Sequence, residues 1–230
     1  MLKAKHRFSF AVAAVSFLLL VACGDDDSDF ATRPSEGSSS SVTPSSSDSE
    51  TSVSTGTMTD SRDGQTYKTV TIGTQTWMAE NLNYETANSY CYKDSASYCT
   101  KYGRLYTWAA ATTACPDGWH LPTQAEWNTL FTAVGGSSTA GKVLKSTSGW
   151  YSSGNGSDAY SFSALPAGHR DYYGNYNSEG DYAHFWSSTE SNSNDAYSMY
   201  LFYSVGDACL DYDGKFTGFS VRCLKDAQAE

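Results

Sequence analysis

The stretch Cys115-Pro-Asp-Gly-Trp-His-Leu-Pro-Thr-Gln-Ala-Glu-Trp127 decides the fold, because it joins a turn to a helix with a recognisable start. Thr123 and Glu126 have the spacing of a capping box, in which each side chain accepts a hydrogen bond from the other residue's backbone N–H. The apolar residues that follow fall on one helical face: Trp127, Leu130, Phe131 and Val134. The stretch therefore predicts an amphipathic helix that begins at Gln124 and is stopped by Gly135 and Gly136.

The N-terminal residues have the pattern of a bacterial lipoprotein signal peptide. Three basic residues precede an apolar run from Phe8 to Ala22, which is shorter than the ~18 residues of a membrane-spanning helix. The run ends at Leu20-Val21-Ala22-Cys23, which has the form of a lipobox. We expect residues 1–22 to be removed and Cys23 to carry acyl chains, palmitate among them, that anchor the chain to a membrane. A plain secretory signal with a chance cysteine is the alternative.

Residues 23–57 are expected to be a flexible tether, because they are rich in Ser and Thr and hold few large apolar groups. The acidic run Asp25-Asp26-Asp27 is typical of surface-export sequences and equally of a solvated tether. The expected location is the cell envelope, as an outer-membrane lipoprotein. The sequence leaves open whether the protein is exposed on the cell surface. The net charge of the chain is −10, which argues against a basic surface for nucleic acid.

The folded domain is expected over residues 58–230. Alternating residues from Tyr67 to Ile72, a Gly73-Thr74 turn and a return strand from Gln75 to Met78 predict a β-hairpin. An Ala-rich run from Tyr106 to Ala114 predicts a further helix. Four later runs predict short strands: Tyr160 to Leu165, His184 to Ser187, Ala196 to Phe202 and Phe219 to Leu224.

The cysteines predict disulfides, because an exported chain meets oxidising conditions. We expect Cys91 to pair with Cys99 across a short loop, and Cys115 with Cys223 between the first predicted helix and the last strand. Cys209 is then left unpaired, and its pairing with Cys223 is the main alternative. No metal site is expected, because no Cys-x-x-Cys pair is present and the histidines of the domain are dispersed: His120, His169 and His184.

Six motifs are spread in order over nearly the whole domain. They are Asp63-Gly64-Gln65-x-Tyr67, Gln75-Thr76-Trp77-Met78-Ala79-Glu80-Asn81-Leu82-Asn83-Tyr84, Gly103-Arg104-Leu105-Tyr106-x-Trp108, Cys115-Pro116-x-Gly118-Trp119-x-Leu121-Pro122-Thr123, Phe185-Trp186-Ser187-Ser188 and Gly218-Phe219-Ser220-Val221-Arg222-Cys223. Together they resemble the Fibrobacter succinogenes major paralogous domain family, a group of exported and often lipid-anchored bacterial proteins without an assigned activity. The resemblance covers Asp63 to Asp226.

This family is in turn similar to the sulfatase-modifying-factor and C-type-lectin-like folds, through the Leu-Pro-Thr-x-x-Glu-Trp helix start and the Gly-Phe-x-x-Arg terminal strand. The resemblance implies an α+β domain with two helices, small antiparallel sheets and long loops. Because a fold does not carry a function with it, the site has to be argued from its own residues.

The sequence gives little support to the hypothesis that the protein is an enzyme. Formylglycine-generating oxidases, which the fold resemblance brings in, use a closely spaced cysteine pair near the C-terminus, whereas Cys209 and Cys223 are far apart. A hydrolytic carboxylate pair such as Asp171 and Glu179, or His169 beside Asp171, is equally explained as solvated loop charge. His120 is expected to be a structural, hydrogen-bonded histidine. The enzyme readings are therefore placed last.

A calcium-dependent lectin would need clustered oxygen ligands, and the Glu-Pro-Asn, Gln-Pro-Asp and Trp-Asn-Asp strings of such lectins are absent. Two groups could still supply oxygens, and calcium stays a minor alternative to no cofactor: Asn192, Asn194 and Asp195, or Asp207, Asp211 and Asp213.

The leading interpretation is a lipid-anchored binding or adhesion module that recognises polysaccharide or a protein partner through the loops between Trp150 and Asp213. Five tyrosines lie there among Gly, Asn and Ser, a composition typical of binding loops: Tyr151, Tyr172, Tyr173, Tyr176 and Tyr182. The same rings could instead fill a core that is poor in aliphatic residues. A structural envelope protein without a small ligand is the second interpretation. The tryptophans expected in the core are Trp77, Trp108, Trp119 and Trp127.

Overall fold

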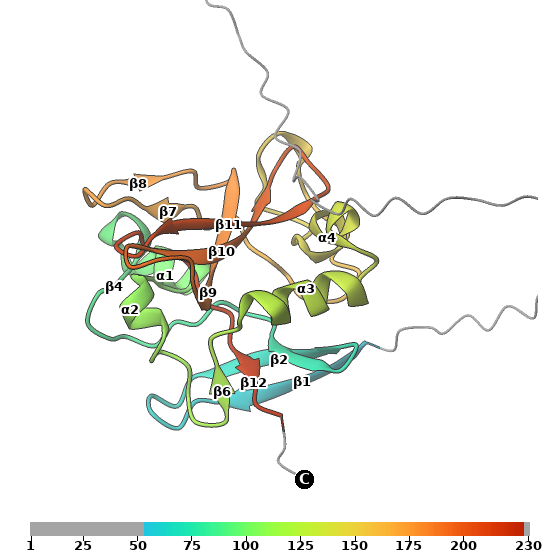
Figure 1. The fold of residues 1–230 in the computed structure, drawn as a ribbon, viewed down its shortest axis with the longest axis horizontal. Helices are drawn as coiled ribbons and strands as arrows, with labels where there is room; N and C mark the ends of the chain where they lie inside the picture. Colours follow the sequence, from blue (N-terminus) through green and yellow to red (C-terminus); the bar gives the residue numbers. More distant parts are fainter. Residues whose placement is uncertain (1–52, 228–230) are drawn as a thin grey trace, which may run out of the picture. The chain divides into compact units, whose positions relative to one another are not determined.

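The computed structural model describes residues 53–227. The predicted signal peptide, Cys23 and most of the tether lie outside these residues. No helix within the described range is long and apolar enough to cross a membrane. The described chain mixes α-helices with small antiparallel sheets and long connections, so it belongs to the α+β class (Figure 1).

The strands of residues 53–227 are short and are joined mainly by turns and irregular loops. They are β1 (Ser54–Thr59), β2 (Thr66–Ile72), β3 (Gln75–Met78), β4 (Ser89–Tyr90), β5 (Leu105–Tyr106), β6 (Trp119–His120), β7 (His169–Arg170), β8 (Tyr176–Asn177), β9 (Tyr182–Glu190), β10 (Asp195–Phe202), β11 (Ala208–Gly214) and β12 (Leu224–Lys225). A five-stranded sheet has the order β1-β2-β3-β12-β6, and a three-stranded sheet has the order β11-β10-β9. Two small ladders, β4-β5 and β7-β8, complete the set.

The same residues contain four α-helices, twice the number expected. They are α1 (Ala96–Tyr102), α2 (Trp108–Ala111), α3 (Gln124–Ala133) and α4 (Ser137–Leu144). Two 3-10 turns, η1 (Tyr92–Asp94) and η2 (Tyr151–Ser153), add to them. Helices α1 and α4 lack the long amphipathic period that made α3 visible in the sequence, because each is only about two turns long.

The capping box and the first hairpin are confirmed. Thr123 Oγ1 accepts from the Glu126 backbone N–H at 3.2 Å, and the Glu126 carboxylate accepts from the Thr123 N–H at 2.7 Å. Strands β2 and β3 pair antiparallel, with Ile72 opposite Gln75. Gly73 sits between them with φ at +59°, a conformation that glycine adopts without strain.

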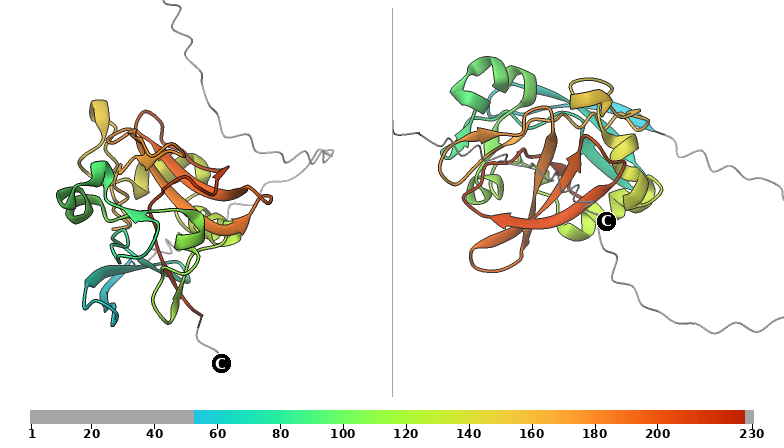
Figure 2. Two further views of the ribbon diagram at one scale, coloured as in Figure 1. Left: turned by 90° about the vertical axis from the view of Figure 1, so that its left-hand side faces the viewer. Right: turned by 90° about the horizontal axis from the view of Figure 1, so that it is seen from above.

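Helix α3 lies between the two larger sheets, as Figures 1 and 2 show, and its buried face forms the core. Trp127 stacks on Trp77 of β3 with ring centroids 4.7 Å apart, and Phe162 and Phe185 pack against it edge-on or tilted. Trp77 and Trp127 are fully buried, as expected. Trp108 and Trp119 are only partly buried, so they border the core instead of lying in it.

Arg222 is a fully buried cation whose hydrogen bonds go to one side-chain amide and to backbone carbonyls. Its guanidinium donates to Asn81 Oδ1 at 2.6 Å, to the Phe162 carbonyl at 2.5 Å and to the Ser163 carbonyl at 2.9 Å. Burial lowers the pKa of Arg222 to about 9. The side chain therefore joins three chain segments that have no regular pairing with one another.

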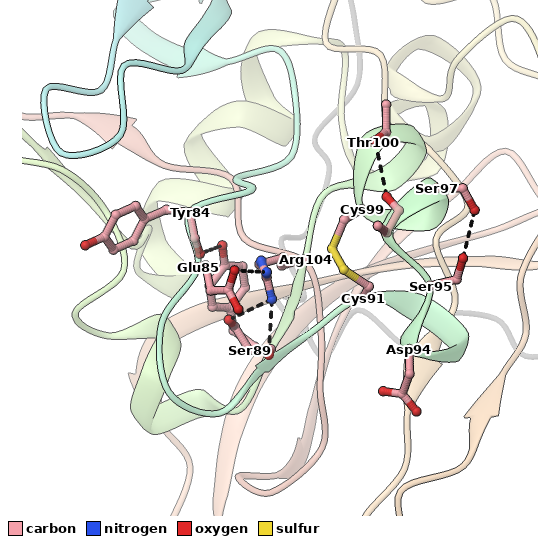
Figure 3. The surroundings of a disulfide bond; sticks show 12 residues. Tyr84, Glu85, Ser89, Cys91, Asp94, Ser95, Ser97, Cys99, Thr100 and Arg104 are labelled. Carbon is pink, nitrogen blue, oxygen red and sulfur yellow. Dashed lines mark hydrogen bonds and ion pairs between the residues drawn. A yellow bond between two sulfur atoms is a disulfide. The ribbon is translucent and has the colours of Figure 1, made fainter.

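Both predicted disulfides are present. Cys91 bonds to Cys99 within α1 (Figure 3), and Cys115 bonds to Cys223 across 108 residues of sequence. The alternative pairing of Cys209 with Cys223 is therefore excluded. The expectation that Cys209 is unpaired is also wrong, because residues 53–227 contain no free cysteine. It rested on elimination along the sequence, which carries no geometric information.

Three predicted elements differ from the structure. Residues 160–165 are not a strand, because Ser161 and Ser163 have positive φ and Asp158 accepts hydrogen bonds from the Ser163 N–H and hydroxyl. The helix expected at 106–114 shrinks to the four residues of α2. Residues 219–223 change partner at each step, from Tyr106 to His184 to Leu82, so only Leu224–Lys225 forms a strand.

Strand β1 begins at Ser54, within the expected tether. It pairs with β2 along its whole length, because Thr and Met side chains there suit an edge strand. The two remaining predictions, at 184–187 and 196–202, are confirmed within the longer strands β9 and β10.

Candidate functional site

The short hairpin β7–β8 carries two of the predicted tyrosines at its tip. Its base is fixed to the turn after β11, because Arg170 and Gly218 exchange backbone hydrogen bonds of 3.0 and 2.8 Å. At the tip, Asp171 accepts from the Asn175 N–H at 2.8 Å and from its side-chain amide at 3.0 Å. This Asx-type turn places Tyr172 and Tyr173 at the exposed end.

Three exposed aromatic rings meet at this tip. Tyr172, Tyr173 and Phe216 are 67%, 85% and 69% exposed. The Tyr172 ring lies 5.4 Å from that of Tyr173 and 5.7 Å from that of Phe216, both edge to face. Phe216 comes from the turn after β11, so the cluster joins two separate chain segments. We call these three rings the aromatic patch.

A cavity of about 140 Å³ opens next to the aromatic patch. It is lined by His169, Asp171, His184, Asp213, Thr217 and Phe219. Asp171 and Thr217 are the chain neighbours of Tyr172 and Phe216, which places the patch at the edge of the cavity. We call this space the histidine cavity. No lysine or arginine lines it among the described residues.

The two histidines of the cavity are enclosed by aromatic rings. His184 lies parallel to Phe219 with centroids 4.5 Å apart and stacks on Tyr182 at 5.2 Å. Burial lowers the pKa of His184 to about 3, and the nearby His169 acts in the same direction. Burial also lowers the pKa of His169, against the charge of Asp171. Both imidazoles are therefore neutral at pH 7, and each has a buried Nδ1 without a hydrogen-bond partner.

The two carboxyl groups of the cavity have opposite environments. Hydrogen bonds from Asn175 hold the pKa of Asp171 below its usual value. Burial raises the pKa of Asp213, although the Ser198 hydroxyl donates to its Oδ2 at 2.8 Å. The cavity thus presents acceptors and neutral rings, which is the chemistry that a hydroxyl-rich, uncharged ligand needs.

The structure brings together only two of the five predicted tyrosines, Tyr172 and Tyr173. Tyr151 is 63% exposed but packs against Tyr203, outside the patch. Tyr176 packs on Tyr92 and donates to Asp94 at 2.5 Å. Tyr182 stacks on Phe202 with centroids 4.4 Å apart. These last two rings are partly buried against other aromatic rings of the domain, which is closer to the alternative interpretation of the tyrosines as packing residues.

The residues considered for hydrolysis and for calcium binding make other contacts in the structure. Glu179 accepts from the Tyr102 hydroxyl at 3.1 Å and pairs with Lys101, and it does not line the cavity that Asp171 lines. Asn192 bonds to Asp195 and to nearby backbone N–H groups in a turn. No group of three or more His, Cys, Asp or Glu in residues 53–227 is arranged to hold a metal ion.

His120 makes the hydrogen bonds expected of a structural histidine. Its Nδ1 lies 2.6 Å from Asp226 and its Nε2 2.9 Å from Glu126. It therefore links the start of α3 to the end of the described chain.

Sequence reasoning missed Phe216 and His184 as site residues. Phe216 follows Asp213-Gly214, a pair typical of turns, and a large aromatic residue in a turn is a recognisable sign of an exposed ring. His184 lies inside a strand-like run, and no pattern in the sequence places it beside His169.

The fold and the site together define a small, disulfide-bonded α+β domain with an exposed aromatic patch beside a polar cavity. The chain belongs to the Fibrobacter succinogenes major domain family, whose model matches residues 70–225. This confirms the resemblance that the motifs indicated. No curated protein and no solved structure matches the chain.

Proposed function

We propose that this chain is a lipid-anchored binding module of the cell envelope, and that the aromatic patch and the histidine cavity bind a neutral polysaccharide. The observation that carries the proposal is the patch itself. Three rings exposed by more than half and held by two chain segments are unusual on a domain whose other large rings are mostly buried.

The chemistry of the patch fits a sugar ring. Aromatic faces contact the C–H groups of a pyranose, while nearby polar groups bond to its hydroxyls and set its orientation. Asp171, Asp213 and Thr217 offer oxygen atoms at the edge of the patch. Because a carboxylate lines the cavity and no cation does, an acidic glycan is disfavoured there by repulsion.

The cellular setting is part of the same proposal. Cys23 would carry the lipid, and the Ser/Thr-rich residues up to β1 would let the domain reach ligands away from the membrane. We also propose that the domain is C-type-lectin-like, which its small antiparallel sheets and long connections support.

A glycan array and a pull-down on insoluble plant polysaccharides test the binding. The full chain should bind neutral polysaccharides, and Tyr172→Ala should weaken binding about fivefold, since an aromatic contact contributes ~1 kcal/mol. Tyr151→Ala is the matched control, because it removes an equally exposed ring outside the patch. Absence of binding in both assays would rule out polysaccharide as the ligand. Equal losses of affinity in the two variants would rule out the aromatic patch as the binding site.

The two buried histidines predict how ligand binding depends on pH. Because burial lowers the pKa of both imidazoles below the usual 6.5, binding should not change with an inflection near 6.5. A step in affinity there would mean that an imidazole charges on the ligand-binding surface, against the description of the cavity.

A further inference from the structure

A second cavity, of about 540 Å³, lies beside the Cys91–Cys99 disulfide and shares no lining residue with the histidine cavity. Its wall is formed by the chain after β3, by the disulfide and α1, and by the turn before β2. Arg104 is the one cation among its lining residues in the described chain. We call this space the Arg104 hollow.

Arg104 is held firmly but has an exchangeable partner. Its side chain is only 13% exposed, and one guanidinium nitrogen lies 3.4 Å from the Ser89 carbonyl and hydroxyl oxygens. The other lies 2.6 Å from the carboxylate of Glu85, a side chain that is 79% exposed (Figure 3). The Glu85 end of this ion pair is exposed to solvent, so an incoming carboxylate can compete with Glu85 for the guanidinium. A guanidinium binds a carboxylate through two parallel hydrogen bonds.

A second observation points to a ligand in the same hollow. Asn83 Oδ1 is buried and has no hydrogen-bond partner, although Asn83 lines the hollow. An unpaired buried acceptor is unfavourable, and a ligand hydroxyl would satisfy it once the Asn83 side chain turns into the hollow. The ligand therefore needs both a carboxylate and hydrogen-bond donors.

We infer that the Arg104 hollow is a separate binding site for an acidic sugar, a uronate whose carboxylate replaces Glu85 on Arg104 and whose hydroxyls bond to Asn83. The rest of the wall fits such a ring. Gln65 and Thr100 supply polar groups, and Tyr84 and the disulfide supply an apolar face. Asp63 is a further carboxylate of the wall, so an acid can bind only where Arg104 faces it. Large aliphatic residues are absent from this wall, so it offers no socket for the apolar side chain of a peptide.

Isothermal titration calorimetry of the full chain with D-galacturonate, and with D-galactose as the neutral match, tests the inference. Galacturonate should bind and galactose should bind about tenfold more weakly, because a hydrogen-bonded charge pair is lost. Arg104→Gln should remove the preference for the acid. Glu85→Gln should tighten galacturonate binding, since it removes the competing carboxylate without touching the wall.

Glu190→Gln is the matched control, because Glu190 is also exposed and paired with a cation, Lys215, but does not line the hollow. Each titration is repeated with Tyr172→Ala, which weakens binding at the aromatic patch but does not alter the Arg104 hollow, so a signal that this variant leaves unchanged belongs to the hollow. The inference is overturned if galacturonate does not bind, if both sugars bind equally, or if Glu85→Gln has no more effect than Glu190→Gln. Because Glu85→Gln predicts a gain, a folding defect cannot imitate the expected result.

Discussion

At the scale of single residues, Arg222 shows how a buried charge can organise an irregular fold. Its hydrogen bonds end on the Phe162 and Ser163 carbonyls and on Asn81, which lie in segments without a shared sheet. In a domain with long loops, such a donor replaces the regular pairing that a larger sheet would supply.

Replacing Arg222 with Met should therefore be strongly destabilising. The buried acceptors would lose their donor at about 1 to 3 kcal/mol each, so we expect the free energy of unfolding to fall by about 3 kcal/mol or more. Chemical denaturation of Arg222→Met against the exposed Lys225→Met measures this loss. A decrease no larger than that of the control would show that the buried hydrogen bonds contribute little.

His120 should make stability depend on pH. Burial alone would lower the pKa of His120, but its hydrogen bonds to Asp226 and Glu126 outweigh burial and raise it above 6.5. The pKa of Glu126 is lowered below 4.5, because hydrogen bonds from Thr123 and His120 outweigh the effect of its burial. The His120 contribution is complete below pH 6.5 and is lost as the pH rises through the folded-state pKa, whereas the Glu126 contribution is lost as the pH falls below 4.5.

The stabilisation by this pair should thus be greatest between pH 4.5 and 6.5. Melting temperatures of the wild type and His120→Gln should differ most between pH 4.5 and 6.5, and the difference should shrink as the pH rises above 6.5. A difference that grows with pH would contradict the hydrogen bonding described for His120.

At the scale of elements, the segment closed by the Cys91–Cys99 disulfide supports the hairpin β7–β8. Tyr92 of η1 packs against Tyr176 of β8 with centroids 5.3 Å apart, and Asp94 accepts from the Tyr176 hydroxyl. Glu179, just after β8, bonds to Tyr102 of α1. The aromatic patch therefore depends on a segment that does not touch the patch.

Replacing Cys91 and Cys99 together with Ser should loosen the hairpin. We expect faster amide hydrogen exchange over residues 169–177 and weaker glycan binding, with little change in α3, which has no contact with the segment in the core clusters. Unchanged exchange in the hairpin would mean that the β7–β8 pairing holds the patch without the disulfide.

The elements that the sequence predicted are those with strong local patterns. Helix α3 has a capping box and an apolar face, and the hairpin β2–β3 has alternation and a turn glycine. The strand predictions for residues 160–165 and 219–223 were wrong for one reason. Their backbone groups form hydrogen bonds with distant segments, or with the nearby Asp158, and not with a neighbouring strand. Hydrogen bonding of this kind leaves no periodic pattern of apolar residues in the sequence, so it cannot be predicted from the sequence.

At the scale of the whole described domain, the Cys115–Cys223 disulfide joins the end of α2 to the final segment over 108 residues. A closed loop of this length stabilises by about 4.8 kcal/mol in the chain-entropy model, against about 2.5 kcal/mol for the short Cys91–Cys99 loop. Unfolding by guanidinium should therefore show a larger loss for the Cys115→Ser and Cys223→Ser pair than for the Cys91→Ser and Cys99→Ser pair. The reverse order would indicate that strain, and not loop length, decides these contributions.

The family and the aromatic region were accessible from the sequence, whereas the site was not. Motifs spread over the domain indicated the family, and both disulfides followed from spacing and position. The partnership of Tyr172 with Phe216, and of His169 with His184, depends on how β7, β9 and the turn after β11 converge. Because these segments meet only in the folded chain, no short stretch of sequence predicts the site.

The most direct test of the proposed binding site is a double-mutant cycle of Tyr172→Ala and Phe216→Ala, with affinity for a bound neutral glycan as the measured quantity. The two rings contact one another across separate segments, so they should act as one surface. We predict that each variant weakens binding and that the double variant loses less than the sum of the two losses. Retention of wild-type affinity by the double variant would contradict the account.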